Sequence, residues 1–146
     1  MTIRVSGTGL LPRSSRKPGA IAAVCRKALK SARTKGPGEL NDVFVSRRRM
    51  LEINKRYLDH DYDTDVIAFQ YDRPRKNEDP FGDVFISVYM ARRQAKEMKH
   101  SVLAELLTLA VHGTLHLLGH DDSTPRKKAS MFRRQDSLLR GKIPPG

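Results

Sequence analysis

A helical pattern over residues 102–118 constrains the fold more than any other feature of this sequence. Seven apolar residues recur there and fall on one arc of a helix at 100° per residue; they are Leu103, Leu106, Leu107, Ala110, Val111, Leu117 and Leu118. Ser101 precedes the pattern as its opening residue. Gly119 ends it, because glycine adopts the left-handed cap conformation at least cost. A helix with one apolar face must bury that face against another layer of structure.

Shorter patterns on both sides of this segment predict four strands and four further helices. Alternating or wholly apolar runs predict strands at residues 2–6, 40–46, 66–69 and 83–88. Apolar residues at helical spacing predict helices at residues 20–33, 47–58, 90–98 and 125–139. Because the third strand is apolar throughout, we expect it at the centre of the sheet. The order β-α-β-α-β-β-α-α-α indicates an α+β fold, in which residues 1–146 form a single small domain with a mixed sheet.

The positive charge is concentrated at the two ends of the chain. The formal net charge is +12; residues 1–38 hold nine Lys or Arg and no acid, and residues 125–146 hold seven and one acid. Two basic ends around a slightly acidic centre favour a polyanionic partner, with RNA or DNA the first candidate. A generic basic surface and, for residues 1–35, a basic organellar presequence are the alternatives.

Cysteine usage and hydropathy favour the cytoplasm. Cys25 is the only cysteine, so no intrachain disulfide forms, and a reducing compartment is the simplest expectation. Cys25 also lies on the apolar face of its predicted helix, where a core role is expected rather than a reactive thiol. We expect neither a membrane span nor a secretory signal, because no run of 18 apolar residues exists and Gly, Pro and Arg interrupt the N-terminal segment.

Three of the five histidines lie within nine residues, in the segment AVHGTLHLLGHDDS at 110–123. His112 and His116 are four residues apart in the predicted helix, so both imidazoles leave the same face, away from the apolar arc. Two imidazoles at that separation can chelate one metal ion. The alternative is that two histidines share a helix face by chance and bind nothing. Glu105 lies on the same side and either orients an imidazole or is solvated.

A third ligand is expected just beyond the helix. The break at Gly119 allows the chain to turn back and bring either His120 or the pair Asp121 and Asp122 to the ion. Two histidines with one carboxylate leave a position open for water, which is typical of a catalytic rather than a structural zinc site.

The predicted metal helix lacks the general base of a zinc peptidase. The peptidase motif H-E-x-x-H carries its base as a glutamate, and Gly113 stands at that position here. We expect the glycine to leave room for a bulky substrate. Asp65 and Asp83 are the candidates for a base, but their place at strand ends is also explained by a structural role, so no catalytic residue is assigned.

Four alternating aspartates at residues 59–65 are suggestive of a calcium loop. Such a loop requires Gly at its sixth position and Glu at its twelfth, whereas Thr64 and Gln70 occupy them here. The segment is therefore predicted to be a polar turn that leads into a strand.

Four segments together resemble the YbeY family. HGTLHLLGHDD at 112–122 is similar to the family signature, and INKRY at 53–57, DTDVIAF at 63–69 and GDVFIS at 82–87 resemble family segments in the same order. The resemblance spans about residues 40–139, and the first 38 residues contribute little to it.

The resemblance implies a zinc-dependent, single-strand-specific endoribonuclease of the bacterial cytoplasm. Family members act in 3′-end maturation of small-subunit ribosomal RNA and in ribosome quality control, so RNA and the ribosome are the implied partners. One zinc ion per chain would be held by His112, His116 and Asp122, where Asp122 takes the place of the family's usual third histidine. His120 occupies the family's aromatic position and is the alternative ligand. Leu58 stands where the family usually carries an arginine. The competing interpretations are a non-catalytic ribosome-assembly factor with a structural metal and, less favoured, a zinc metallopeptidase.

Overall fold

The computed structural model describes residues 1–32, 38–70 and 81–141, and contains one four-stranded sheet with five α-helices. The strands are β1 (Thr2–Ser6), β2 (Glu39–Val45), β3 (Val66–Gln70) and β4 (Phe81–Ser87), in the spatial order β1-β2-β4-β3. β1, β2 and β4 are parallel, and β3 is antiparallel to β4. The helices are α1 (Pro18–Ser31), α2 (Arg47–Leu58), α3 (Val88–Met98), α4 (Val102–Leu117) and α5 (Pro125–Leu139). Two short 3-10 turns, Thr8–Leu10 and Arg13–Ser15, lie between β1 and α1.

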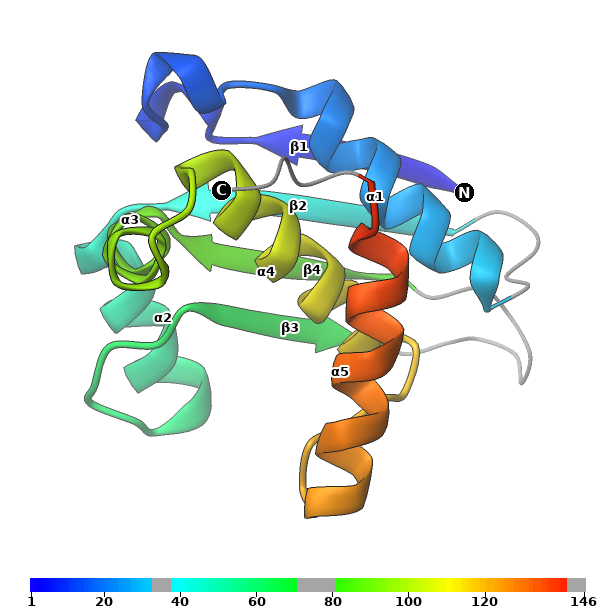
Figure 1. The fold of residues 1–146 in the computed structure, drawn as a ribbon. Helices are drawn as coiled ribbons and strands as arrows, with labels where there is room; N and C mark the ends of the chain where they lie inside the picture. Colours follow the sequence, from blue (N-terminus) through cyan, green and yellow to red (C-terminus); the bar gives the residue numbers. More distant parts are fainter. Residues whose placement is uncertain (33–37, 71–80, 142–146) are drawn as a thin grey trace.

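Helices cover both faces of the sheet, as Figure 1 shows. α1 and α4 pack on one face, and α5 packs against α4, around a core that includes Val84 and Ile86 of β4. On the other face α2 buries Met50 and Ile53 in a smaller cluster with Val45 and Ile67. The predicted α+β class, mixed sheet and element order are confirmed.

The apolar arc of the longest helix is buried as expected. Leu106, Leu107, Ala110, Val111 and Leu117 are buried, while Leu103 and Leu118 are partly buried against the same core. Cys25 is fully buried too, which fits the predicted core role. No described helix is long and apolar enough to cross a bilayer.

The position predicted for the third strand is wrong. β3 lies at an edge of the sheet, not at its centre. Its residues are apolar because helices cover both of its faces: Val66 and Ala68 pack on the α4 side, and Ile67 and Phe69 on the α2 side. A strand buried on two faces reads as a continuous apolar run even when one of its edges is unpaired.

Candidate metal centre

Two histidines of α4 lie together on one side of the helix, His112 next to α5 and His116 next to the edge of β3. The Nε2 atoms of His112 and His116 are 3.1 Å apart, and their ring centroids are separated by 4.7 Å. Both side chains are half-buried. Two nitrogens that each bind one tetrahedral zinc ion at 2.0–2.1 Å are separated by roughly 3.3 Å, so the observed spacing fits a shared ion.

The turn after α4 brings a carboxylate to the same place. α4 ends at Leu117, and Gly119 adopts a left-handed φ of 97°. The N–H of His120 then donates to the Leu115 carbonyl at 3.0 Å, which closes the turn. As a result, one ligand atom each from His112, His116 and Asp122 lie within 4.8 Å of one another.

Of the candidate third ligands, only Asp122 joins this group. No other His, Cys, Asp or Glu of the described segments completes a triad with the two histidines, so His120 lies outside it. The carboxylate of Asp121 points instead to its own turn, where it accepts from the N–H and hydroxyl of Ser123 at 2.9 and 2.6 Å.

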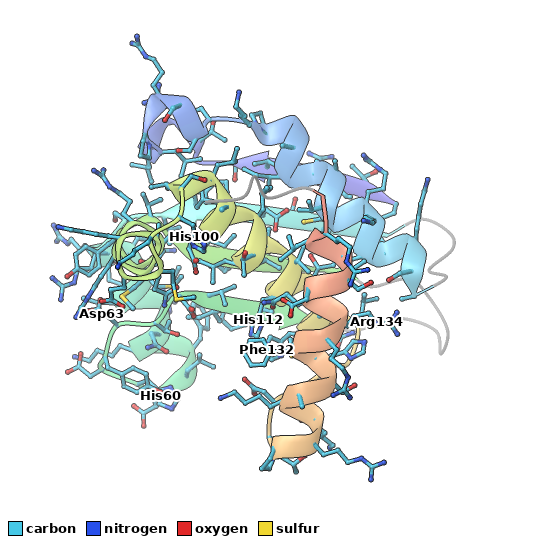
Figure 2. The ribbon with its side chains drawn as sticks, in the orientation of Figure 1. His60, Asp63, His100, His112, Phe132 and Arg134 are labelled. Carbon is cyan, nitrogen blue, oxygen red and sulfur yellow. The ribbon has the colours of Figure 1, made fainter. Side chains whose placement is uncertain are left out.

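Gln135 of α5 sets the orientation of His112. Its Oε1 lies 3.0 Å from Nδ1 of His112, so the imidazole carries its proton on Nδ1 and presents the lone pair of Nε2. Figure 2 shows His112 on α4, next to α5. Gln135 has the helical spacing of a core residue and is indeed buried. Its polar role was therefore missed at the sequence level.

The environment favours the neutral form of His116. Burial lowers the pKa of His116, and the neighbouring His112 lowers it further. A neutral imidazole is the form that binds metals. The donor set of two such nitrogens and one carboxylate oxygen suits zinc, because it leaves a fourth tetrahedral position open.

A groove of about 500 Å³ includes His116 and follows the outer edge of β3, the edge that pairs with none of the other described strands. Its walls come from the end of α2, the loop at 58–64 and β3 itself. Leu58, at the position where an arginine was expected from the resemblance, is one of the wall residues. We refer to this feature as the β3 groove.

Sequence and structure comparisons identify the family. A sequence profile described as endoribonuclease YbeY matches residues 14–142. The chain belongs to the YbeY family. A protein of Elusimicrobium minutum named endoribonuclease YbeY is 44% identical over 117 residues, which cover 79% of this chain and 78% of that protein. A protein of the same name from Bacillus thuringiensis is 38% identical over 128 residues, 82% of each chain. A solution structure from Thermotoga maritima shares the fold, with a TM-score of 0.61 and 22% identity over 94% of this chain and 85% of that one.

Gly113 has a different role from the one expected of it. A Cβ at this position would lie 2.4 Å from Cγ1 of Val84 on β4, so the glycine allows α4 to pack closely on the sheet. The expectation that it leaves room for substrate is wrong. Position 113 packs against β4, so a larger side chain such as the peptidase glutamate would collide with Val84.

The acidic residues considered as partners of the site lie elsewhere. Glu105 is buried and makes a hydrogen bond of 2.7 Å with Nε2 of His100, so it is neither solvated nor a partner of the two site histidines. Asp65 accepts hydrogen bonds from its neighbouring backbone and from Gln94. Asp83 accepts one from Asn41. Within the described ranges, neither aspartate belongs to the metal group, and the general base stays unassigned.

Proposed function

We propose that this chain is a zinc-dependent endoribonuclease that cleaves single-stranded RNA at a centre formed by His112, His116 and Asp122. The observation that carries the proposal is the convergence of three ligand atoms within 4.8 Å at the mouth of a groove, in a chain of the YbeY family. The relatives named endoribonuclease YbeY support RNA as the substrate.

The chain's own residues would prepare the site before RNA arrives. His112 and His116 present two Nε2 atoms on one helix face, and Gln135 holds the first ring in place. When bound, zinc would polarise a phosphoryl oxygen or lower the pKa of a bound water toward about 7. The half-burial of both rings limits competition from solvent for the ligand atoms.

The cellular role follows the family resemblance. We propose late 3′-end maturation of small-subunit ribosomal RNA and ribosome quality control in the bacterial cytoplasm, with the ribosome or its small subunit as partner. The basic ends of the chain support a polyanionic partner.

Cleavage of end-labelled single-stranded RNA tests the catalytic part of this proposal. The purified protein should cut the single strand with zinc, lose activity with a chelator, regain it when zinc is restored, and leave a duplex of the same sequence intact. The His112→Ala/His116→Ala double variant should be inactive throughout. If the protein binds zinc and RNA but cuts neither the single-stranded RNA nor the duplex, it would instead be an assembly factor with a structural metal.

A further inference from the structure

The β3 groove differs in its chemistry from the two basic ends of the chain. Among the described residues that line it, none is Lys, Arg, Asp or Glu. Its walls are aliphatic side chains, neutral polar groups and the rings of His60 and Tyr62, and it is continuous with the metal centre through His116. An uncharged groove is a poor place for a phosphate and a suitable one for an aromatic base.

Tyr62 projects from the loop between α2 and β3 as a supported aromatic surface. Its ring stacks on that of His60, with centroids 4.9 Å apart and planes at 21°. The Tyr62 hydroxyl and Nδ1 of His60 are hydrogen-bonded at 2.9 Å. Tyr62 is nevertheless 56% exposed. Figure 2 marks His60 at the position of this loop.

Buried and charged contacts hold the loop in this conformation. Nδ2 of Asn54, on α2, donates to the Tyr62 carbonyl at 2.8 Å. The guanidinium of Arg47 makes two hydrogen bonds to Asp63, at 3.1 and 2.8 Å. Tyr62 is therefore positioned before a ligand binds, which reduces the entropy lost when a base stacks on it.

The edge of β3 adds polar groups to the groove. The N–H of Ser87 donates to the Asp65 carbonyl, so Asp65 faces β4 and, by alternation in an antiparallel pair, so does Ile67. The main-chain N–H and C=O of Ala68 then point away from β4, toward the groove that Ala68 lines. A donor and an acceptor side by side match the polar edge of a nucleobase.

We propose that the β3 groove is a nucleobase subsite, in which an unstacked base of single-stranded RNA stacks on Tyr62 beside the metal centre. This inference rests on the proposed ribonuclease function and adds to it the way in which the site selects single strands. A base paired within a duplex is not free to enter the groove, whereas an unpaired base can leave its neighbours and stack on the tyrosine.

Equilibrium binding of a short single-stranded RNA to metal-free protein tests the subsite without any cleavage. Tyr62→Ala should weaken binding by about 5- to 150-fold, the range found when one stacking aromatic is removed. Tyr62→Phe should bind almost as tightly as the wild type, because the ring remains. Tyr57→Ala is the matched control: Tyr57 is 58% exposed but does not line the groove, and its loss should change little.

A series of RNAs with one abasic nucleotide each makes the test specific to a base. In the wild type one position should lose affinity on removal of its base, and in Tyr62→Ala that loss should disappear. A fluorescent 2-aminopurine at this position should be quenched by the wild-type protein, a readout that needs no variant. Equal affinities of the Tyr62→Ala and Tyr57→Ala proteins, with no dependence on any single base, would overturn the subsite, and an extended peptide along β3 would then be the better occupant. If the subsite fails in this way but the wild-type protein still cleaves RNA, the proposed ribonuclease function is retained.

Discussion

Some neighbours of the His112 side chain are close to it in the sequence, and one lies on another helix. His112, His116 and the turn at Gly119 all lie within ten residues of Asp122, so the sequence indicated the cluster that the structure brings together. The spacing left His120 and the two aspartates as alternatives for the third position, and the family resemblance favoured Asp122. Gln135 lies 23 residues beyond His112, on another helix. Its contact depends on how α5 packs on α4, which helical periodicity does not reveal.

Replacing Gln135 tests this contact. Gln135→Leu removes the acceptor for Nδ1 of His112, and loss of such a partner typically weakens metal binding 10- to 100-fold. Gln135→Glu retains an acceptor oxygen and should stay close to the wild type. Competition with a chromophoric chelator measures both, and a Leu variant with wild-type zinc affinity would show that Gln135 does not position the ligand.

Asp42 is a buried carboxyl group at the centre of the molecule. It lies on β2, fully shielded from solvent, and accepts a hydrogen bond from Sγ of Cys25 at 3.1 Å. Its Oδ1 has no hydrogen-bond partner among the described residues. Burial raises the pKa of Asp42 from 3.8 to about 7.

The raised pKa predicts that stability falls as the pH rises. Between about pH 4 and about pH 7 the folded state holds the Asp42 proton and the unfolded state does not, so unfolding becomes easier with increasing pH. At roughly 1.4 kcal/mol per pH unit the loss is on the order of 4 kcal/mol. Asp42→Asn should remove this pH-dependent loss. The free energy of unfolding of the variant in urea, relative to that of the wild type, should therefore be higher at pH 7.5 than at pH 5. A constant difference at the two pH values would contradict the assignment.

At the level of elements, local patterns predicted every strand and helix in order, but not their lateral arrangement. The Ser101 cap and the Gly119 stop of α4 are short-range signals, and the ends of α2 and α5 match the prediction. β3 lies at an edge because the later strand β4 pairs between β2 and β3. That is a long-range contact, which a run of apolar residues does not encode.

Gly113 allows α4 to pack closely on β4 of the sheet. Gly113→Ala would place a methyl group 2.4 Å from Cγ1 of Val84 and force the helix away from β4. Overpacking of this kind costs about 1–3 kcal/mol, which chemical denaturation would measure as a loss of unfolding free energy. Adding Val84→Ala should recover part of the loss, whereas two independent, additive losses would exclude this contact as the cause.

Over the whole molecule, basic residues flank the metal centre. Arg126, Lys127 and Lys128 are exposed at the start of α5, four to six residues after Asp122. Lys127 makes a contact of 3.5 Å to Asp121, the neighbour of the proposed ligand Asp122. Cations oppose the dipole at a helix start, so these three residues cost a little stability there.

The salt dependence of RNA binding tests whether these residues guide the strand. If all three contact phosphates, replacing them with Ala should flatten the slope of log K against log salt by up to about 2. A control variant at Arg92, Lys96 and Lys99 of α3 and its C-cap, at the opposite end of α4, should leave the slope unchanged. An unaltered slope in the α5 variant, with its fold intact, would mean that these residues form only a solvated surface.

The zinc content of the purified protein is the most direct test of the metal centre. Elemental analysis of the wild type should find about one zinc per chain, because the three ligands and one open position define a single tetrahedral site. The folded His112→Ala/His116→Ala variant should contain none, and Asp122→Ala should retain zinc less tightly than His120→Ala does. A full complement of zinc in the double-histidine variant would contradict the account.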